Sequence, residues 1–170
     1  MAPETASRVR WPAGHEPEGA DIHAVNAATS AAAPAEAWAW IARPDMWGRF
    51  YTNARLIRPQ AGSWPQLQAG TRFRWMTFGA IVTTTVTEYE PFERLAWTGG
   101  GLGAVGHHAW VIEERGPGET LITTEETQRG AAVRLLRPVL APAMAHWHQR
   151  WVDGLARVAE SGPPPAPSAR

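Results

Sequence analysis

The sequence predicts an α+β domain in which an antiparallel sheet wraps around one long C-terminal helix. Short strand-like segments rich in aromatic residues follow one another between Gly70 and Gln128. After them, apolar residues recur at spacings of three and four, as on one face of a helix: Val133, Leu136, Leu140, Met144, Trp147, Trp151, Leu155 and Val158. Such a helix must bury its apolar stripe, and the preceding sheet is the only large partner. A sheet curled around one helix leaves room for a cavity.

The 170 residues are enough for one domain with its own core. Residues 1–20 are rich in proline, glycine and charge without any period, so we expect a disordered N-terminal segment. Residues 161–170 contain three consecutive prolines, and we expect a disordered proline-rich tail there. The folded domain is therefore predicted to span residues 21–160.

Composition excludes several classes of protein. The formal net charge of zero shows no electrostatic footprint for nucleic acid or an anionic membrane. Without cysteine there is no disulfide, thiolate metal site or cysteine nucleophile. No signal-like N-terminus or membrane-length apolar run is present, so a cytoplasmic location is the default expectation. The ten tryptophans indicate a large aromatic core or an aromatic-lined pocket.

The first part of the domain reads as a strand, two short helices and a second strand. Residues 22–30 alternate weakly, as a strand does. Pro34 suits the first turn of a helix that continues to Ile41. Asp45 is placed to cap a second short helix over residues 46–51, and residues 53–58 follow as a strand.

A meander of strands follows, with residues 71–78 and 81–89 joined by a tight turn at Gly79-Ala80. The register of this hairpin stays open, because a one-residue slip exchanges the two faces. Either Val82, Thr84 and Val86 or Ile81, Thr83, Thr85 and Thr87 face inward. Residues 95–98 form the next strand, and residues 107–114 and 120–128 form a second hairpin. Pro138 and Pro142 predict a kink, or a late start of the regular helix near Ala143.

Five segments carry a resemblance to a known superfamily: residues 30–38, 45–47, 70–75, 86–97 and 118–126. Together they resemble the helix-grip fold of the Bet v 1-like, START-like or SRPBCC superfamily, over residues 22–160. Within it the chain looks like the polyketide cyclase/dehydrase and lipid-transport family. The resemblance implies a deep cavity between sheet and helix. Its expected ligand-binding residues are Trp47, Tyr51, Phe73, Trp75, Trp110, Ile122, Thr124, Met144, Trp147, His148 and Trp151.

His108 and Glu126 are the candidate catalytic residues, because both are expected to face the cavity on adjacent strands. A desolvated carboxyl has a raised pKa and serves as an acid, with the imidazole as a base. The alternative is that Glu126 lies at the cavity mouth and is solvated.

No metal or other cofactor is expected from the histidine spacings. His107 and His108 point to opposite faces of a strand. His146 and His148 lie roughly 200° apart around a helix, so His146 faces outward and His148 lies beside the apolar stripe. The glycine-rich run 99–106 lacks the Lys-Ser/Thr of a phosphate loop and reads as a flexible loop at the cavity edge.

The leading functional hypothesis is binding of a hydrophobic small molecule of polyketide, lipid or sterol type. The first alternative is a cofactor-independent polyketide cyclase/dehydratase in which His108 or Glu126 shuttles protons. A third is a protein-partner module, which predicts an exposed apolar patch rather than a cavity. Neither nucleic acid binding nor stable membrane insertion is expected. The sequence does not indicate which oligomeric state the protein adopts.

Overall fold

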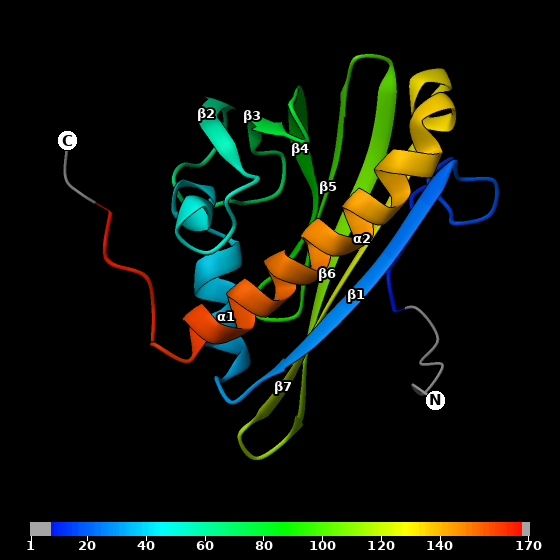
Figure 1. Cartoon of the computed structure of the whole chain (residues 1–170). Coiled ribbons are helices and arrows are strands. Elements are labelled where there is room, and N and C mark those ends of the chain that lie inside the picture. The colour runs from blue at the N-terminus through cyan, green and yellow to red at the C-terminus, as the bar shows by residue number, and fades with distance from the viewer. Residues whose placement is uncertain (1–7, 168–170) are drawn as a thin grey trace.

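A computed structural model describes residues 8–167, and in it one antiparallel sheet grips a long C-terminal helix (Figure 1). The strands are β1 (Ile22–Ser30), β2 (Arg55–Ala61), β3 (Arg72–Thr77), β4 (Ala80–Glu90), β5 (Arg94–Gly101), β6 (Ala104–Gly116) and β7 (Glu119–Arg129). Their spatial order is β1-β7-β6-β5-β4-β3-β2, so the chain begins at one edge and returns to it. The predicted α+β architecture is confirmed.

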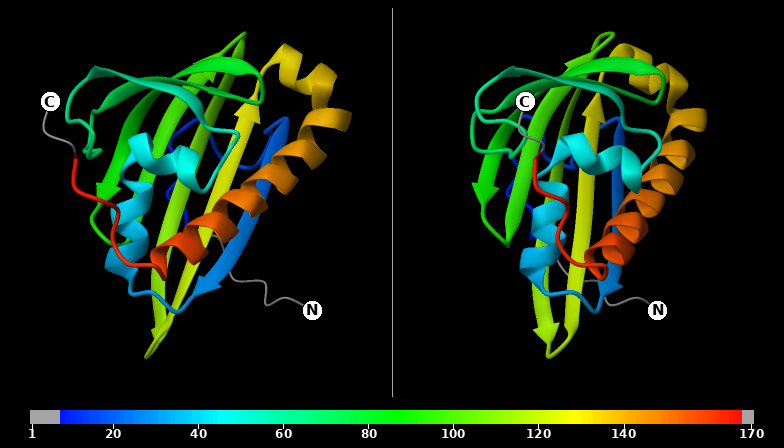
Figure 2. Two further views of the ribbon diagram at one scale, coloured as in Figure 1. Left: turned by 60° about the vertical axis from the view of Figure 1, so that its left-hand side comes forward. Right: turned by 90° about the vertical axis from the view of Figure 1, so that its left-hand side faces the viewer.

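Three helices lie on the same face of this sheet (Figure 2). They are α1 (Pro34–Ile41), the 3-10 helix η1 (Pro44–Arg49) and α2 (Ala131–Ala159). Pro34 occupies the first turn of α1, where its missing N–H costs nothing. None of the described helices is long and apolar enough to cross a membrane.

The long helix α2 starts at Ala131 and runs unbroken through Pro138 and Pro142. Its axis changes direction near the start, between the yellow and orange parts in Figure 1, which is the kink that prolines produce. The late start near Ala143 is not observed. Only the second half is well covered, since Leu135, Leu136 and Val139 are exposed. Leu136, which the periodicity assigns to the buried stripe, therefore faces solvent.

The hairpin between β3 and β4 resolves the open register. Trp75 pairs with Val82, which places Val82, Thr84 and Val86 on the concave face. The two loop residues are Phe78 and Gly79, both with positive φ (49° and 75°), as a tight hairpin turn requires. The turn thus begins one residue earlier than predicted. The sequence pattern does not indicate Phe78 as a turn residue, since phenylalanine rarely adopts a positive φ.

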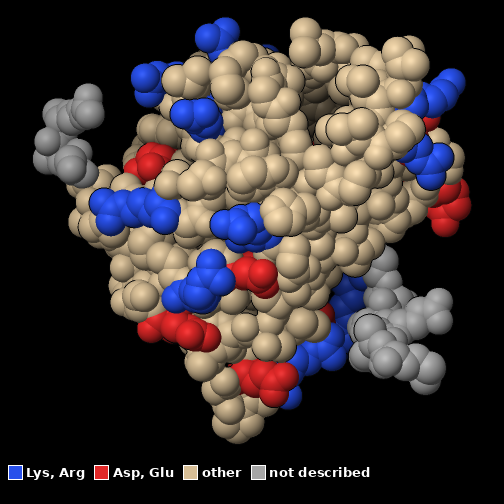
Figure 3. Space-filling view, in the orientation of Figure 1, with Lys and Arg blue, Asp and Glu red and all other residues tan. Residues whose placement is uncertain are grey.

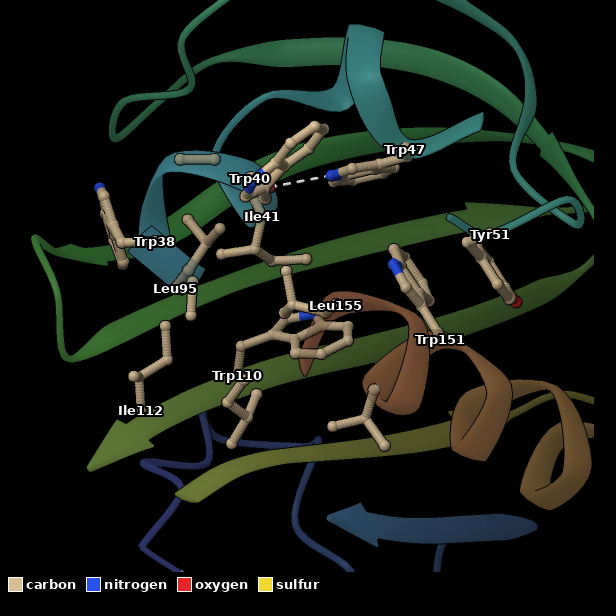
Figure 4. Close-up of a cluster of buried hydrophobic side chains, with 14 of the residues drawn as sticks. Trp38, Trp40, Ile41, Trp47, Tyr51, Leu95, Trp110, Ile112, Trp151 and Leu155 are labelled. Atoms are coloured by element: carbon tan, nitrogen blue, oxygen red, sulfur yellow. Dashed lines mark hydrogen bonds between the residues drawn. The ribbon is translucent and has the colours of Figure 1, made fainter. Parts of the chain in front are cut away.

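Aromatic side chains fill most of the space between the sheet and α2 (Figure 4). The ring of Trp47, from η1, lies 5.1–5.7 Å from the rings of Phe73, Trp75, Trp97 and Trp151. Its indole N–H donates to the Ile41 carbonyl at 2.9 Å, which satisfies the polar atom of a fully buried residue. The concave face is therefore a packed core over most of its length.

The segment before β1 differs from the expectation of disorder. Over residues 8–20 it lies on the convex face, where Val9 and Trp11 pack against Ala96, Ala109 and Val111. The guanidinium of Arg129 donates to carbonyl oxygens of residues 16, 18 and 19. The side chains of Ala96, Ala109 and Val111 are small, so they leave space on the convex face that the N-terminal segment covers. Residues 1–7 lie outside the described part.

The proline-rich tail also makes contacts after α2. The indole N–H of Trp40 donates to the Gly162 carbonyl at 2.7 Å, and Arg43 donates to the Pro165 carbonyl at 3.4 Å. Residues 161–167 therefore follow the surface beside α1, which differs from the disordered tail expected from composition. Residues 168–170 are outside the described part.

Candidate functional site

One pocket enters the concave face, at the end of the sheet where α2 begins. Its cavity volume is about 60 Å³. Figure 3 shows a hollow on this side of the molecule, near the top of the view. The walls come from β3 to β7 and α2: Trp75, Thr77, Phe78, Val82, Thr84, Trp97, Gly99, Gly100, Gly101, Ala104, Gly106, His108, Glu126, Gln128, His148 and Trp151. Aromatic side chains supply much of the wall, and a cluster of titratable groups supplies the polar part.

The polar cluster joins two strands and the helix. His108 of β6 and Glu126 of β7 are direct cross-strand partners, and strand alternation points both into the concave face. His148 comes from α2, one turn before Val152. The Glu126 carboxylate oxygen Oε2 lies 3.0 Å from Nδ1 of His108 and 3.2 Å from Nε2 of His148. Both imidazoles therefore converge on one carboxylate oxygen.

Neighbouring polar groups fix the orientation of this cluster. The Thr124 hydroxyl lies 3.2 Å from the Ala109 carbonyl, to which it can donate. It also lies 2.6 Å from Nε2 of His108, and the tautomer of the imidazole determines which of these two groups donates. The second carboxylate oxygen of Glu126 accepts from the Gln128 amide at 2.7 Å. His108 is thus held between the Thr124 hydroxyl at Nε2 and the Glu126 carboxylate at Nδ1.

Burial and charge act in opposite directions on the cluster. Burial alone would raise the pKa of Glu126, but the charges and hydrogen bonds of His108 and His148 lower it well below its usual range. For His108, burial dominates and lowers the pKa although Glu126 opposes it. Glu126 is therefore an anion, and burial favours the neutral form of His108.

Two buried donors or acceptors in the pocket wall have no hydrogen-bond partner among the described residues. They are Nδ1 of His148 and the indole N–H of Trp151. Buried polar groups are normally paired, so these two atoms are exceptions beneath the pocket surface. The polar groups of the pocket wall are therefore mainly those of the His108–Glu126–His148 cluster.

Comparison with known proteins identifies the family. Residues 21–160 match the model of the family described as polyketide cyclase / dehydrase and lipid transport. The chain belongs to this family. No curated protein matches the chain. Its helix-grip, Bet v 1-like fold agrees with the expectation from the sequence.

Three solved structures show how widely the fold is shared. A hypothetical protein of Helicobacter pylori is 27% identical, with a TM-score of 0.84 over 91% of this chain and 98% of its own. A protein of Thermus thermophilus is 16% identical, with a TM-score of 0.68 over 82% of this chain and 97% of its own. The Zhui aromatase/cyclase of Streptomyces sp. R1128 is 12% identical, with a TM-score of 0.68 over 81% of this chain and 93% of its own.

In this member of the polyketide cyclase / dehydrase and lipid transport family, the expected site residues separate into two groups. Five line the pocket: His108, Glu126, Trp75, His148 and Trp151. Thr124 lies behind His108, as described above. The others are outside the pocket wall: Trp47, Tyr51, Phe73, Trp110, Ile122 and Met144 are buried in the core, and half-buried Trp147 packs against Tyr51. The deep cavity implied by the resemblance is thus reduced to one end.

Sequence reasoning missed Trp97 and Gln128, whereas it placed the glycine-rich run 99–106 at the cavity edge. Trp97 follows Leu95 by two positions on β5, so strand alternation was the available signal. The glycine-rich run is the end of β5 and the start of β6 rather than a flexible loop, with its turn at Leu102 and Gly103. A Cβ atom at Gly101 would lie 2.3 Å from the Ile81 carbonyl oxygen, so the strands approach too closely there for a side chain.

Proposed function

We propose that this protein binds a flat, hydrophobic small molecule that carries oxygen substituents, as aromatic polyketides do. The observation that carries the proposal is the composition of the pocket. Trp75, Trp97 and Trp151 offer apolar faces that suit planar rings. The His108–Glu126–His148 cluster lies in the same wall and offers partners for a keto or hydroxyl oxygen.

The size of the pocket limits how such a ligand binds. Pockets for drug-sized molecules usually measure about 300–1,000 Å³, whereas the cavity here is about 60 Å³. Only one oxygen-bearing end of the ligand is therefore enclosed, next to the cluster. The remainder lies along the mouth, beside Phe78 and the glycine-rich strand ends.

Titration of the intrinsic tryptophan fluorescence with aromatic polyketides, fatty acids and sterols, in buffer containing EDTA, tests this proposal. We expect saturable quenching by the aromatic polyketides, because three pocket residues are tryptophans. Val82→Phe, which adds bulk in the pocket wall, should abolish the response. Ile81→Phe is the matched control, since Ile81 is the preceding residue of β4 and is exposed. Equal responses from the two variants would contradict binding in this pocket.

A second function is favoured by the contact between Glu126 and His108. A carboxylate and an imidazole 3.0 Å apart form a pair that takes and returns protons. In a cyclase/dehydratase, the pair removes a proton from a carbon between two carbonyls and that carbon attacks a third carbonyl. The resulting alkoxide receives a proton, and a further proton transfer releases water. Glu126→Gln should then abolish turnover of a poly-β-keto substrate while ligand binding persists. Unchanged turnover would remove Glu126 from the reaction.

A further inference from the structure

Three potential metal ligands meet at the pocket wall from three different elements. We propose that His108, Glu126 and His148 bind a divalent transition-metal ion. The metal-ligating atoms of the three residues all lie within 4.8 Å of one another. Their side chains are 5%, 12% and 1% exposed, so the cluster is buried rather than a solvated group of surface charges. This inference goes beyond the proposed function and does not depend on it.

The distances fit a metal centre. Zinc lies about 2.0–2.2 Å from histidine nitrogen and carboxylate oxygen ligands. Two ligands at that distance, separated by roughly 90–110° at the metal, are about 3.0–3.5 Å apart. The two nitrogens lie 3.0 Å and 3.2 Å from Oε2 of Glu126. These two separations therefore match those between ligands of one metal ion, and the two histidine nitrogens lie within 4.8 Å of each other.

One ion can contact all three ligands at the same time. Both imidazole nitrogens approach the same atom, Oε2 of Glu126, from different elements of the fold. An ion placed beside this oxygen is therefore close to the nitrogens of His108 and His148 as well.

The surroundings have the features of an outer coordination shell. Metal-binding histidines usually donate their second N–H to a neighbouring acceptor, and the Thr124 hydroxyl oxygen lies 2.6 Å from Nε2 of His108. Metal-binding carboxylates are usually hydrogen-bonded in turn, and Gln128 donates to the second oxygen of Glu126. These contacts orient the ligands before any ion binds.

The ligand set indicates which ions fit. Two imidazoles and one carboxylate suit zinc or ferrous iron, and three protein ligands leave coordination positions open. All three residues line the pocket, so an open position is accessible to water or to an oxygen of a bound molecule. Magnesium, which prefers oxygen ligands and octahedral geometry, is not expected to bind.

Calorimetric titration of the EDTA-treated full chain with ZnCl2, without any organic ligand, tests the site. We expect one zinc ion per chain, and affinities at least tenfold lower for His148→Gln and for Glu126→Gln. His146→Gln is the first control, because His146 is exposed two residues earlier on α2. His23→Gln is the second, because His23 forms a His–Glu pair at 3.1 Å with Glu125 on the convex face of the sheet. Both controls should bind zinc like the wild type, and MgCl2 should give no heat of binding.

Cobalt(II) supplies a readout that does not depend on the folding of a variant. The wild type should develop visible absorption bands with one equivalent of Co²⁺, and zinc should displace them. If the wild type takes up neither ion stoichiometrically, a proton bridges the cluster and the proposal is overturned. It is equally overturned if a folded His148→Gln variant, checked by circular dichroism, retains the wild-type affinity. Because organic ligands are titrated in EDTA, failure of the metal site and failure of the ligand pocket are separate results.

Discussion

Replacing Thr124 by valine tests whether its hydroxyl orients the cluster. Thr124 is fully buried on β7, and valine has nearly the same shape without the hydroxyl. The change removes the 2.6 Å contact with Nε2 of His108 and the 3.2 Å bond to the Ala109 carbonyl. The imidazole is then free to rotate and to exchange its proton between the two nitrogens.

The expected magnitude follows from the groups that lose their partner. A buried polar group left without its hydrogen-bond partner costs about 1–3 kcal/mol, so the free energy of unfolding should fall by about that amount. Loss of an outer-shell contact to a metal-binding histidine lowers metal affinity about 10–100-fold. The variant should therefore remain folded at room temperature but bind zinc about 10–100-fold more weakly.

Thr120→Val separates the two effects. Thr120 lies on the same strand and is equally buried, and its hydroxyl donates to the Ala32 carbonyl at 2.6 Å. It lies several residues along the strand from the position that pairs with His108, so it does not contact the cluster. Urea denaturation should show a similar loss of stability for both variants, and calorimetry should show a zinc defect for Thr124→Val alone. Equal zinc affinities in the two variants would refute the orienting role of Thr124.

Two further predictions concern packing around the site. Gly154→Ala should lower the free energy of unfolding by about 1 kcal/mol, because the added Cβ would lie 2.5 Å from the Phe50 carbonyl oxygen. Overpacking costs about 1–3 kcal/mol, which exceeds the gain of about 1 kcal/mol in helix propensity. Gly48→Ala is its control, since a Cβ there meets nothing within 4 Å, and a Gly154→Ala variant more stable than wild type in urea would contradict the argument. Trp11→Ala should lower the free energy of unfolding by about 2 kcal/mol, roughly half the cost of truncating a fully buried tryptophan. The reason is that Trp11 is half-buried on the convex face, where it packs against His107 and the small residues beside it. An unchanged unfolding midpoint would show that the N-terminal segment does not pack there.

The sequence by itself determined the architecture and the faces on which the three cluster residues lie. Strand alternation assigned His108 and Glu126 to the concave face of neighbouring strands, and the helical stripe placed His148 beside the buried side of α2. These patterns are local, because a side chain's direction follows from its position within a strand or helix. The meeting of all three depended on where α2 crosses β6 and β7, and reasoning from pairs of histidines close in the chain did not reveal it.

Only the tertiary structure decided how much of the concave face stays open. Alternation identifies Phe73 and Trp110 as buried, but it does not distinguish a side chain that fills a core from one that lines a cavity. That distinction depends on the separation of sheet and helix, which is set by the packing of many side chains together. The same holds for the convex face. Val9 and Trp11 lie in a segment without a period, and they became part of the core because small side chains on a distant part of the sheet left space for them.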